Sequence, residues 1–359
     1  MRAPPSRRLG PIAVMTISLM ASVLLLSLLG AVFALLGDTR KEHEQEAPPT
    51  PSPSSFSLAP PGFLLRLSLF PDQQRKRKLI GVIVENQETA RLYQQGLEEA
   101  LFIEEFHVEG MISRFLAIFD VQDLPLMIGP IRSLRPYFLD ASQPWISVII
   151  HAGGSPEAFE KLALLPDITA INGLRYDDGE HFLRSDAAPA PHNFFLPASS
   201  VDALLEENLR IHGEDAVQEF PATLWPPYAT GAPPPGGSGA TIIRINYFST
   251  SHNVEYQLLP DGSYLRVNGG IESALHPRNV LIVELPITEI GELGRLTIPV
   301  EGKGDVLLFR SGNVYQGHWK KKTATASWEF SGIDGQPLRF AAGALWMTAV
   351  PELGRIKWE

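Results

Sequence analysis

Two arginines three residues apart are the strongest candidates for chemistry in this chain. Arg132 and Arg135 lie in the sequence GPIRSLRP. On one face of a helix, two guanidinium groups at this spacing can bind a phosphate or a carboxylate through paired hydrogen bonds. Glu109 and Arg114, from a turn and a strand expected just upstream, could orient such a site. The alternative is an internal ion-pair network in which Arg132 or Arg135 binds Glu109 or Asp140.

A glycine turn between a strand and a helix forms the second candidate site. Its residues are His151, Gly153, Gly154 and Ser155, in the sequence HAGGSP. The serine suits the N-cap position, because its hydroxyl can accept a hydrogen bond from a free amide. Free amides at a helix N-terminus bind anions, and ligands of open α/β sheets favour the carboxyl ends of strands. The alternative is a tight turn without a ligand.

Ser155 does not suit a serine hydrolase, although an aspartate and His192 follow it in the chain order of such enzymes. The residue after the nucleophile supplies an oxyanion-hole amide in these enzymes, and here that residue is Pro156, which has no N–H. His192 and Asn193, which follow Ala-Pro, are more consistent with a loop that bonds its own backbone or closes a cleft.

We expect no metal and no cofactor. The chain has no cysteine and no H-E-x-x-H motif, and its histidines are scattered along the sequence. Zinc without cysteine needs a cluster of histidines and carboxylates, which this pattern does not provide. The absence of cysteine also excludes disulfides and lipidation of an N-terminal cysteine.

An expected α/β domain at 63–222 positions these residues. Apolar and β-branched runs predict its strands, and the run WISVIIH has the continuous apolar character of a strand covered on both faces. The expected strands are 79–84, 103–108, 114–119 and 145–151, and the expected helices are 91–100 and 156–165.

The chain at 240–359 is expected to form a mostly-β domain, as a sandwich or a curled sheet. A Pro- and Gly-rich segment at 223–239 is the expected linker, since neither a helix nor an inner strand tolerates that composition. Trp319, Trp328 and Trp346 occupy strand positions and are expected in the core rather than in a sugar-stacking platform. The expected strands are 241–248, 253–258, 264–268, 279–285, 305–309, 313–318, 326–330 and 345–350.

The N-terminal part of the sequence predicts a membrane anchor. The segment 12–36 is almost wholly apolar and exceeds the roughly 20 residues that span a bilayer. Arginines in segment 1–11 place the N-terminus in the cytoplasm and the remaining chain outside. The segment 37–62 is charged and then rich in Pro and Ser, which predicts a disordered tether. A cleaved signal peptide is the alternative, but its apolar region would be shorter.

The charge of the chain argues against a nucleic-acid partner. The formal net charge is −10, and the signs are mixed along the sequence. Nucleic-acid binders usually carry a basic face. Two short basic runs, 75–78 and 320–322, are expected to be solvated strand edges or ends.

Several long motifs resemble the YerB-like family of bacterial envelope proteins, which are usually lipoproteins of undetermined function. In the first half the motifs are VEGMISRFLAIF, IGPIRSLRPYFLD, HAGGSPEA and APHN. In the second half they are GSYLRVNGG, NVLIVE, GKGDVLLFRSGNVYQGHWKK and GALWM. The resemblance covers about 77–352 and implies a place and an architecture but no reaction. The chain departs from it at Met111 and Ser113, where the family usually has glycine and threonine, and in lacking the lipobox cysteine.

Three functions remain open from the sequence. The leading hypothesis is a membrane-anchored, extracytoplasmic binding protein that recognises an anionic envelope component or a partner protein. The second is an envelope enzyme acting on a phosphate- or carboxylate-bearing substrate, with His151 or Glu109 as general base. The third is a scaffold whose surfaces bind other envelope proteins.

Overall fold

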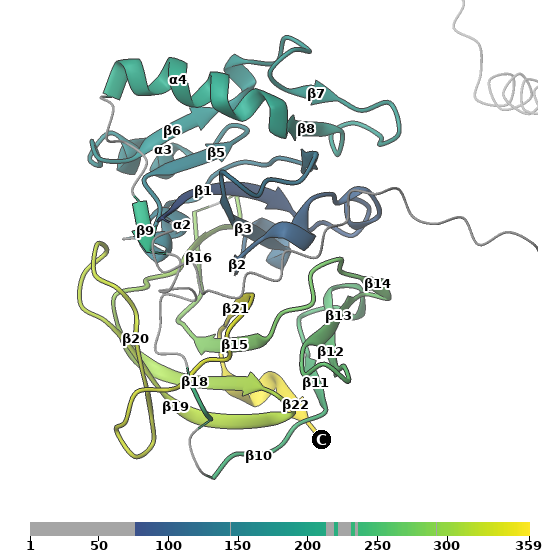
Figure 1. Cartoon of the computed structure of the whole chain (residues 1–359), viewed down its shortest axis with the longest axis vertical. Coiled ribbons are helices and arrows are strands. Elements are labelled where there is room, and N and C mark those ends of the chain that lie inside the picture. The colour runs from purple at the N-terminus through teal and green to yellow at the C-terminus, as the bar shows by residue number, and fades with distance from the viewer. Residues whose placement is uncertain (1–75, 144, 213–218, 222–230, 234–235, 292) are drawn as a thin grey trace, which may run out of the picture. The chain divides into compact units, whose positions relative to one another are not determined.

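The computed structural model describes residues 76–143, 145–212, 219–221, 231–233, 236–291 and 293–359 (Figure 1). The predicted membrane helix at 12–36 and the tether at 37–62 lie outside these residues. Within the described part of the chain, no helix is long and apolar enough to cross a membrane.

A 12-stranded mixed sheet forms the centre of the described residues. Its main path, in spatial order, is β10 (Ser238–Gly239), β19 (Asn313–Lys321), β18 (Gly302–Arg310), β15 (Asn279–Glu284), β21 (Leu345–Val350), β2 (Phe102–His107), β3 (Ser113–Asp120), β1 (Lys76–Glu85), β5 (Val148–His151) and β6 (Thr169–Asn172). Off this path, β20 (Glu329–Gly332) pairs with β19, and β9 (Glu219–Pro221) pairs with β1.

The two predicted halves of the chain share this sheet. Strand β2 of the first half pairs in parallel with β21 of the second, with Phe102 opposite Leu345 and Ile103 opposite Trp346. The division of the chain into two domains, at 63–222 and 240–359, stays a prediction. The hydrogen-bonded ladder of the sheet passes from one half of the chain to the other.

Three smaller sheets complete the β structure. One contains β14 (Ile271–Glu272), β13 (Tyr264–Asn268), β12 (Val254–Leu258), β11 (Ile242–Ile245) and β22 (Ile356–Trp358) in that order. The others are the hairpin of β16 (Thr288–Ile290) and β17 (Arg295–Thr297), and the set β4 (Met127–Ile128), β8 (Phe194–Pro197) and β7 (Leu183–Arg184). The predicted mixed α/β first half and mostly-β second half are confirmed.

Three α-helices, all in the first half, are described: α2 (Pro136–Ser142), α3 (Pro156–Leu162) and α4 (Val201–His212). The predicted N-cap of α3 is confirmed, because the Ser155 hydroxyl accepts a hydrogen bond from the Ala158 amide at 3.2 Å. The predicted helix at 91–100 is wrong. Two short 3-10 turns, Arg91–Tyr93 and Leu97–Glu99, occupy this segment, because Gly96 between them has a left-handed backbone with φ 82°.

The core confirms one expectation for the second half and corrects another. Trp319, Trp328 and Trp346 are buried, as predicted. Lys321, in a run expected to be solvated, is fully buried instead. Its ammonium group donates hydrogen bonds to the carbonyl oxygens of Gln143 and Ala326, and this is how a buried charge is accommodated.

Candidate functional site

A polar pocket of about 330 Å³ lies where β1 ends and β3 begins. The segment 129–135 closes it, since the Arg132 amide donates to the Ile83 carbonyl oxygen at 2.9 Å. Register brings the two strands together, with Glu85 opposite Arg114. The lining residues are Glu85, Asn86, Gln87, Val108, Glu109, Ile112, Ser113, Arg114, Arg132, Ser133 and His192.

Arg132 belongs to a three-residue cluster on one wall of the pocket. Its guanidinium donates to Glu85 Oε1 at 2.6 Å. His192 Nδ1 lies 3.0 Å from Glu85 Oε2, and its Nε2 lies 3.0 Å from Thr89 Oγ1. The carboxylate therefore orients both the arginine and the imidazole. Neither partner in this cluster is one that the sequence hypothesis gave to Arg132.

Arg135 forms a forked ion pair with Glu109. Its Nε and one terminal nitrogen donate to the two carboxylate oxygens at 2.7 and 2.6 Å. Burial works against the charge of Glu109, yet the hydrogen bonds from Arg135 leave the pKa of that carboxyl below its usual value. From the sequence, Arg135 could bind either an anionic ligand or an internal carboxylate. The structure shows the internal ion pair, with Glu109. Each of these two charges therefore already has a counter-charge within the protein.

Arg114 differs from its two neighbours. It lines the pocket, is partly buried, and donates one hydrogen bond to the Ser133 carbonyl oxygen at 2.6 Å. Among the described residues it forms no salt bridge, because Glu85 pairs with Arg132 and Glu109 with Arg135. Burial, followed by the nearby charge of Arg135, lowers the pKa of Arg114 to about 10, so the group is still a cation at neutral pH.

The glycine turn at 153–155 is a structural turn and not part of the pocket. The Gly153 amide donates to Asn172 Oδ1 at 2.9 Å, and the Ser155 amide donates to the Leu134 carbonyl oxygen at 3.2 Å. These amides, which the sequence hypothesis assigned to an anion, already have acceptors. Gly154 pairs with Leu134 in an isolated bridge.

His151 is buried beside this turn, with its Nδ1 2.7 Å from the Gly153 carbonyl oxygen. Burial lowers the pKa of His151 to about 4, so the ring is neutral at physiological pH. It does not line the pocket, and the hypothesis that makes it a general base there loses its geometric support.

His192 and Asn193 are adjacent in one loop, but only His192 lines the pocket. His192 enters the pocket, and its own amide bonds the Pro189 carbonyl oxygen at 2.8 Å, as expected for a loop that bonds its own backbone. Asn193 lies outside, where its Oδ1 accepts a hydrogen bond from Arg184 at 3.4 Å.

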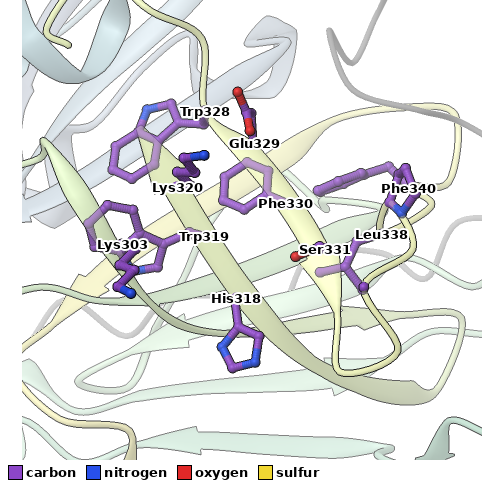
Figure 2. Close-up of a pocket in the computed structure, with 12 residues that line it drawn as sticks. Lys303, His318, Trp319, Lys320, Trp328, Glu329, Phe330, Ser331, Leu338 and Phe340 are labelled. Atoms are coloured by element: carbon purple, nitrogen blue, oxygen red, sulfur yellow. The ribbon is translucent and has the colours of Figure 1, made fainter. Parts of the chain in front are cut away.

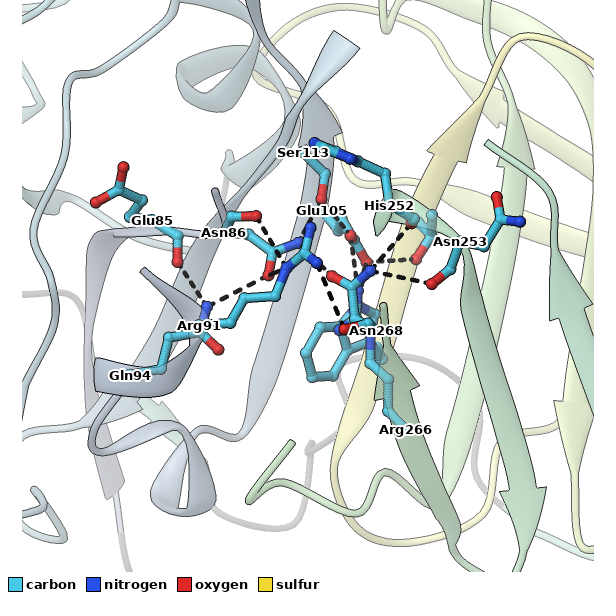
Figure 3. Close-up of polar contacts among 12 residues, drawn as sticks. Glu85, Asn86, Arg91, Gln94, Glu105, Ser113, His252, Asn253, Arg266 and Asn268 are labelled. Carbon is cyan, nitrogen blue, oxygen red and sulfur yellow. Dashed lines mark hydrogen bonds and ion pairs between the residues drawn. The ribbon is translucent and has the colours of Figure 1, made fainter. Parts of the chain in front are cut away.

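Sequence reasoning missed the pair Glu85-Asn86 at the end of β1. Figure 3 shows Asn86 in the centre of a polar network, with its Nδ2 2.7 Å from Ser113 Oγ and 2.8 Å from Asn268 Oδ1. Arg91 donates to the Asn86 Oδ1 at 3.3 Å and to the carbonyl oxygen of Ser251. The sequence signal that could have identified this pair is its position, directly after the apolar run of β1. The network links the pocket wall to β13 and to the loop before β12.

Next to this network lies a fully buried ion pair between the two halves of the chain. Arg266 donates to both oxygens of Glu105 at 2.8 and 3.0 Å. Trp346 Nε1 donates to the same carboxylate at 2.8 Å. The guanidinium also lies over the indole, 4.3 Å from the ring centroid. These contacts satisfy a charge that β2 would otherwise bury without compensation.

A larger pocket of about 570 Å³ lies over β18, β19 and β20 (Figure 2). The rings of Trp319, Trp328 and Phe330 form its floor, and Lys303 and Lys320 face each other across the two longer strands. These rings are at most 7% exposed, so they fill the core and offer no face for stacking. No group of histidines and carboxylates in the described residues could hold a metal ion.

Comparison with known proteins gives the family. A model described as "Protein of unknown function (DUF3048) N-terminal domain" matches 69–211, and the corresponding C-terminal domain model matches 243–347. The chain is 31% identical over 286 residues to "Putative lipoprotein YerB" of Bacillus subtilis strain 168, covering 77% of this chain and 82% of that protein. The chain belongs to the YerB-like family. The resemblance predicted from the sequence motifs is therefore confirmed.

The crystal structure of YerB from Bacillus subtilis is similar to this chain, with a TM-score of 0.68 and 29% sequence identity. The similarity covers 79% of this chain and 94% of the YerB chain. The two family models fall on the two halves that share the large sheet.

Proposed function

We propose that this protein is a membrane-anchored, extracytoplasmic binding protein of the bacterial envelope whose pocket binds a phosphate or carboxylate group. The envelope location is supported by the relative named as a lipoprotein and by the apolar run at 12–36 preceded by arginines. With no cysteine available for a lipid, a single membrane helix would replace the lipid anchor.

The observation that carries the proposal is that Arg114 forms no salt bridge with any of the described residues. The two carboxylates of the pocket are each paired to another arginine, which leaves a partly buried guanidinium facing a polar cavity. A buried cation that lacks a counter-charge is costly, and an anionic ligand would remove that cost. The planar guanidinium suits phosphate and carboxylate oxygens.

The test is calorimetric titration of inorganic phosphate and of acetate into the full chain held in lipid nanodiscs. We expect Arg114→Gln to weaken binding by roughly tenfold to a hundredfold, the usual value of a charge-assisted hydrogen bond. Arg244→Gln is the matched control, because that arginine is exposed and paired in the other half of the chain.

The melting temperature separates lost binding from lost folding. Arg114→Gln should change it by only a few degrees, since the one hydrogen bond that the Arg114 side chain donates among the described residues goes to a carbonyl oxygen. Saturable binding with the same affinity in Arg114→Gln and in the parent chain would refute the proposal. So would the absence of saturable binding to either anion.

An envelope enzyme is the second candidate, and the arrangement of His192 favours it. The imidazole lies between Glu85 and the Thr89 hydroxyl, as in sites where a carboxylate orients a general base. His192 thus replaces His151 and Glu109 as the candidate base. Turnover of a phosphoester that requires His192, with anion binding retained in His192→Gln, would favour this candidate over a pure binding protein.

A further inference from the structure

The cavity of about 570 Å³ over β18, β19 and β20 is lined by two lysines that face each other across a strand pair. Lys303 on β18 is the register partner of Lys320 on β19. The side chains of such partners point to the same face of a sheet, with Cβ atoms about 4.5–5.5 Å apart. Figure 2 shows both lysines at the cavity. Their ammonium groups can therefore reach one and the same ligand.

The carboxylates closest to this lysine pair in the strand register are bound to other cations. Asp305 Oδ1 on β18 lies 2.8 Å from His318 Nδ1. Glu329 on β20 is the register partner of the second lysine, yet its carboxylate forms an ion pair with Lys322 at 3.2 Å. Among the described residues, neither member of the lysine pair forms a salt bridge with a carboxylate.

Two like charges directly opposite each other destabilise a pair of strands. The chain compensates such a pair elsewhere. Arg244 on β11 is the register partner of Lys357 on β22, and its guanidinium is paired with Glu255 and Glu359. The lysine pair at the cavity has no such carboxylates. An anion between its two ammonium groups would replace a repulsion with two attractions.

The chemistry of lysine favours phosphate as this anion. An ammonium group is a compact point charge with three donors, whereas the planar fork of arginine is the group that matches a planar carboxylate. A phosphate carries up to two charges on oxygens that point in tetrahedral directions, so ammonium groups from two strands can each bind oxygens of one phosphate.

We infer that the cavity is a second anion site, in which the ammonium groups of Lys303 and Lys320 together bind one phosphate group. The site lies in the second half of the chain and shares no lining residue with the pocket of Arg114. The inference therefore does not depend on the proposed function.

The test is calorimetric titration of inorganic phosphate into the full Arg114→Gln chain in nanodiscs, with empty nanodiscs as the blank. This chain should still bind one phosphate saturably, and acetate more weakly. Lys303→Gln and Lys320→Gln, each added to it, should weaken phosphate binding by roughly tenfold or more, and both together should abolish it. Lys357→Gln is the matched control, because that lysine is exposed and also lies opposite a cation, and it should leave binding unchanged.

The melting temperature shows whether the lysines act on the fold. Neither single lysine variant should lower it, since each removes one of two like charges that face each other. Phosphate should raise the melting temperature of the Arg114→Gln chain and should not raise that of the same chain without the two lysines.

Two results would overturn the inference: no saturable phosphate binding in the Arg114→Gln chain, and binding that persists without both lysines. The first leaves the proposed function standing if the parent chain binds phosphate. Equal affinity for acetate and phosphate would contradict the assignment to phosphate. If the parent and Arg114→Gln chains bind the same number of phosphates, and only the lysine variants lose them, this site stands and the proposed function fails.

Discussion

Met111 shows at the scale of one residue how a side chain is accommodated in a left-handed turn. Gly110 and Met111 both have left-handed backbones, with φ 69° and 57°. The second of these is unfavourable for a residue with a side chain, by roughly 1 kcal/mol or more. The resemblance to the YerB-like motif implies glycine there, and this chain accepts the strain next to Ile112, which lines the pocket. Strain of this kind concentrates at functional sites.

Two buried histidines make the stability of the fold depend on pH. Burial lowers the pKa of His151 and of His107 from 6.5 to about 4. An unfolded chain binds protons at these positions as pH falls below 6.5, whereas the folded chain resists them until about pH 4. Their contribution to stability is therefore full above pH 6.5 and is lost as pH falls from 6.5 to 4.

We expect His151→Asn to remove one of these contributions. Each histidine should cost about 2 kcal/mol of stability between pH 7 and pH 5, at roughly 1.4 kcal/mol for each unit of pH below 6.5. The difference in free energy of unfolding between the parent and His151→Asn should therefore shrink by about this amount at pH 5. Urea unfolding at the two pH values measures it. A difference that stays constant would show that His151 is not held neutral in the fold.

The types of residue in the site were predictable, but most of their pairings were not. The fork between Arg135 and Glu109 was anticipated as an alternative, because Glu109 lies in the turn before the strand that precedes the arginine segment. The pairing of Arg132 with Glu85 joins positions 47 residues apart and depends on strand register. The glycine turn looked like an anion site because its amides have no acceptor within the turn itself. Their acceptors, Asn172 and Leu134, come from other elements and could not be inferred from the local sequence.

Strand β2 is the element in which local pattern and fold differ most. All six of its residues are buried, including the adjacent pair Glu104 and Glu105. Sequence patterning placed the strand correctly but would leave one of two adjacent carboxylates in solvent, because successive side chains point to opposite faces. Both are buried because each has a cation nearby. Glu105 pairs with Arg266, and Glu104 lies near the charge of Lys321. Burial raises the pKa of Glu104 to about 8.

Removal of Arg266 should destabilise the fold strongly. Arg266→Met leaves the charge of Glu105 buried without its partner, at a cost of about 3–5 kcal/mol. The double variant Glu105→Gln with Arg266→Met should be more stable than the single variant, because no uncompensated charge remains. Urea denaturation of the three proteins checks this. Equal losses in the single and double variants would mean that packing around Trp346, rather than charge, dominates.

At the scale of the whole molecule, the described residues behave as one structural unit. The large sheet, the pair Glu105–Arg266 and the hydrogen bond from Asn86 to Asn268 all join the first half of the chain to the second. A Pro- and Gly-rich linker in the sequence suggested two bodies. It could not show that an edge of each body would pair with the other, since strand pairing between distant segments leaves no local signal.

The halves should therefore fail to fold separately. A fragment ending at residue 222 would expose the edge of β2, and a fragment starting at residue 231 would bury Arg266 without Glu105. We expect neither fragment to show cooperative thermal unfolding, and we expect coexpression to restore a soluble complex. Circular dichroism melts of each fragment and of the mixture provide the measurement. A cooperative transition in the first fragment alone would contradict this expectation.

The position of β1 has a mechanical consequence. This strand is the first described element of the chain, and it lies inside the large sheet, antiparallel to β3 and parallel to β5. A pulling force applied through the segment that precedes Lys76 would load β1 along its own axis. Its ladder with β3, registered from Leu79 to Glu85, would then be sheared as a whole rather than opened one bond at a time. A chain pulled from its N-terminal end would thus resist extension along the ladder that ends at Glu85, beside the pocket.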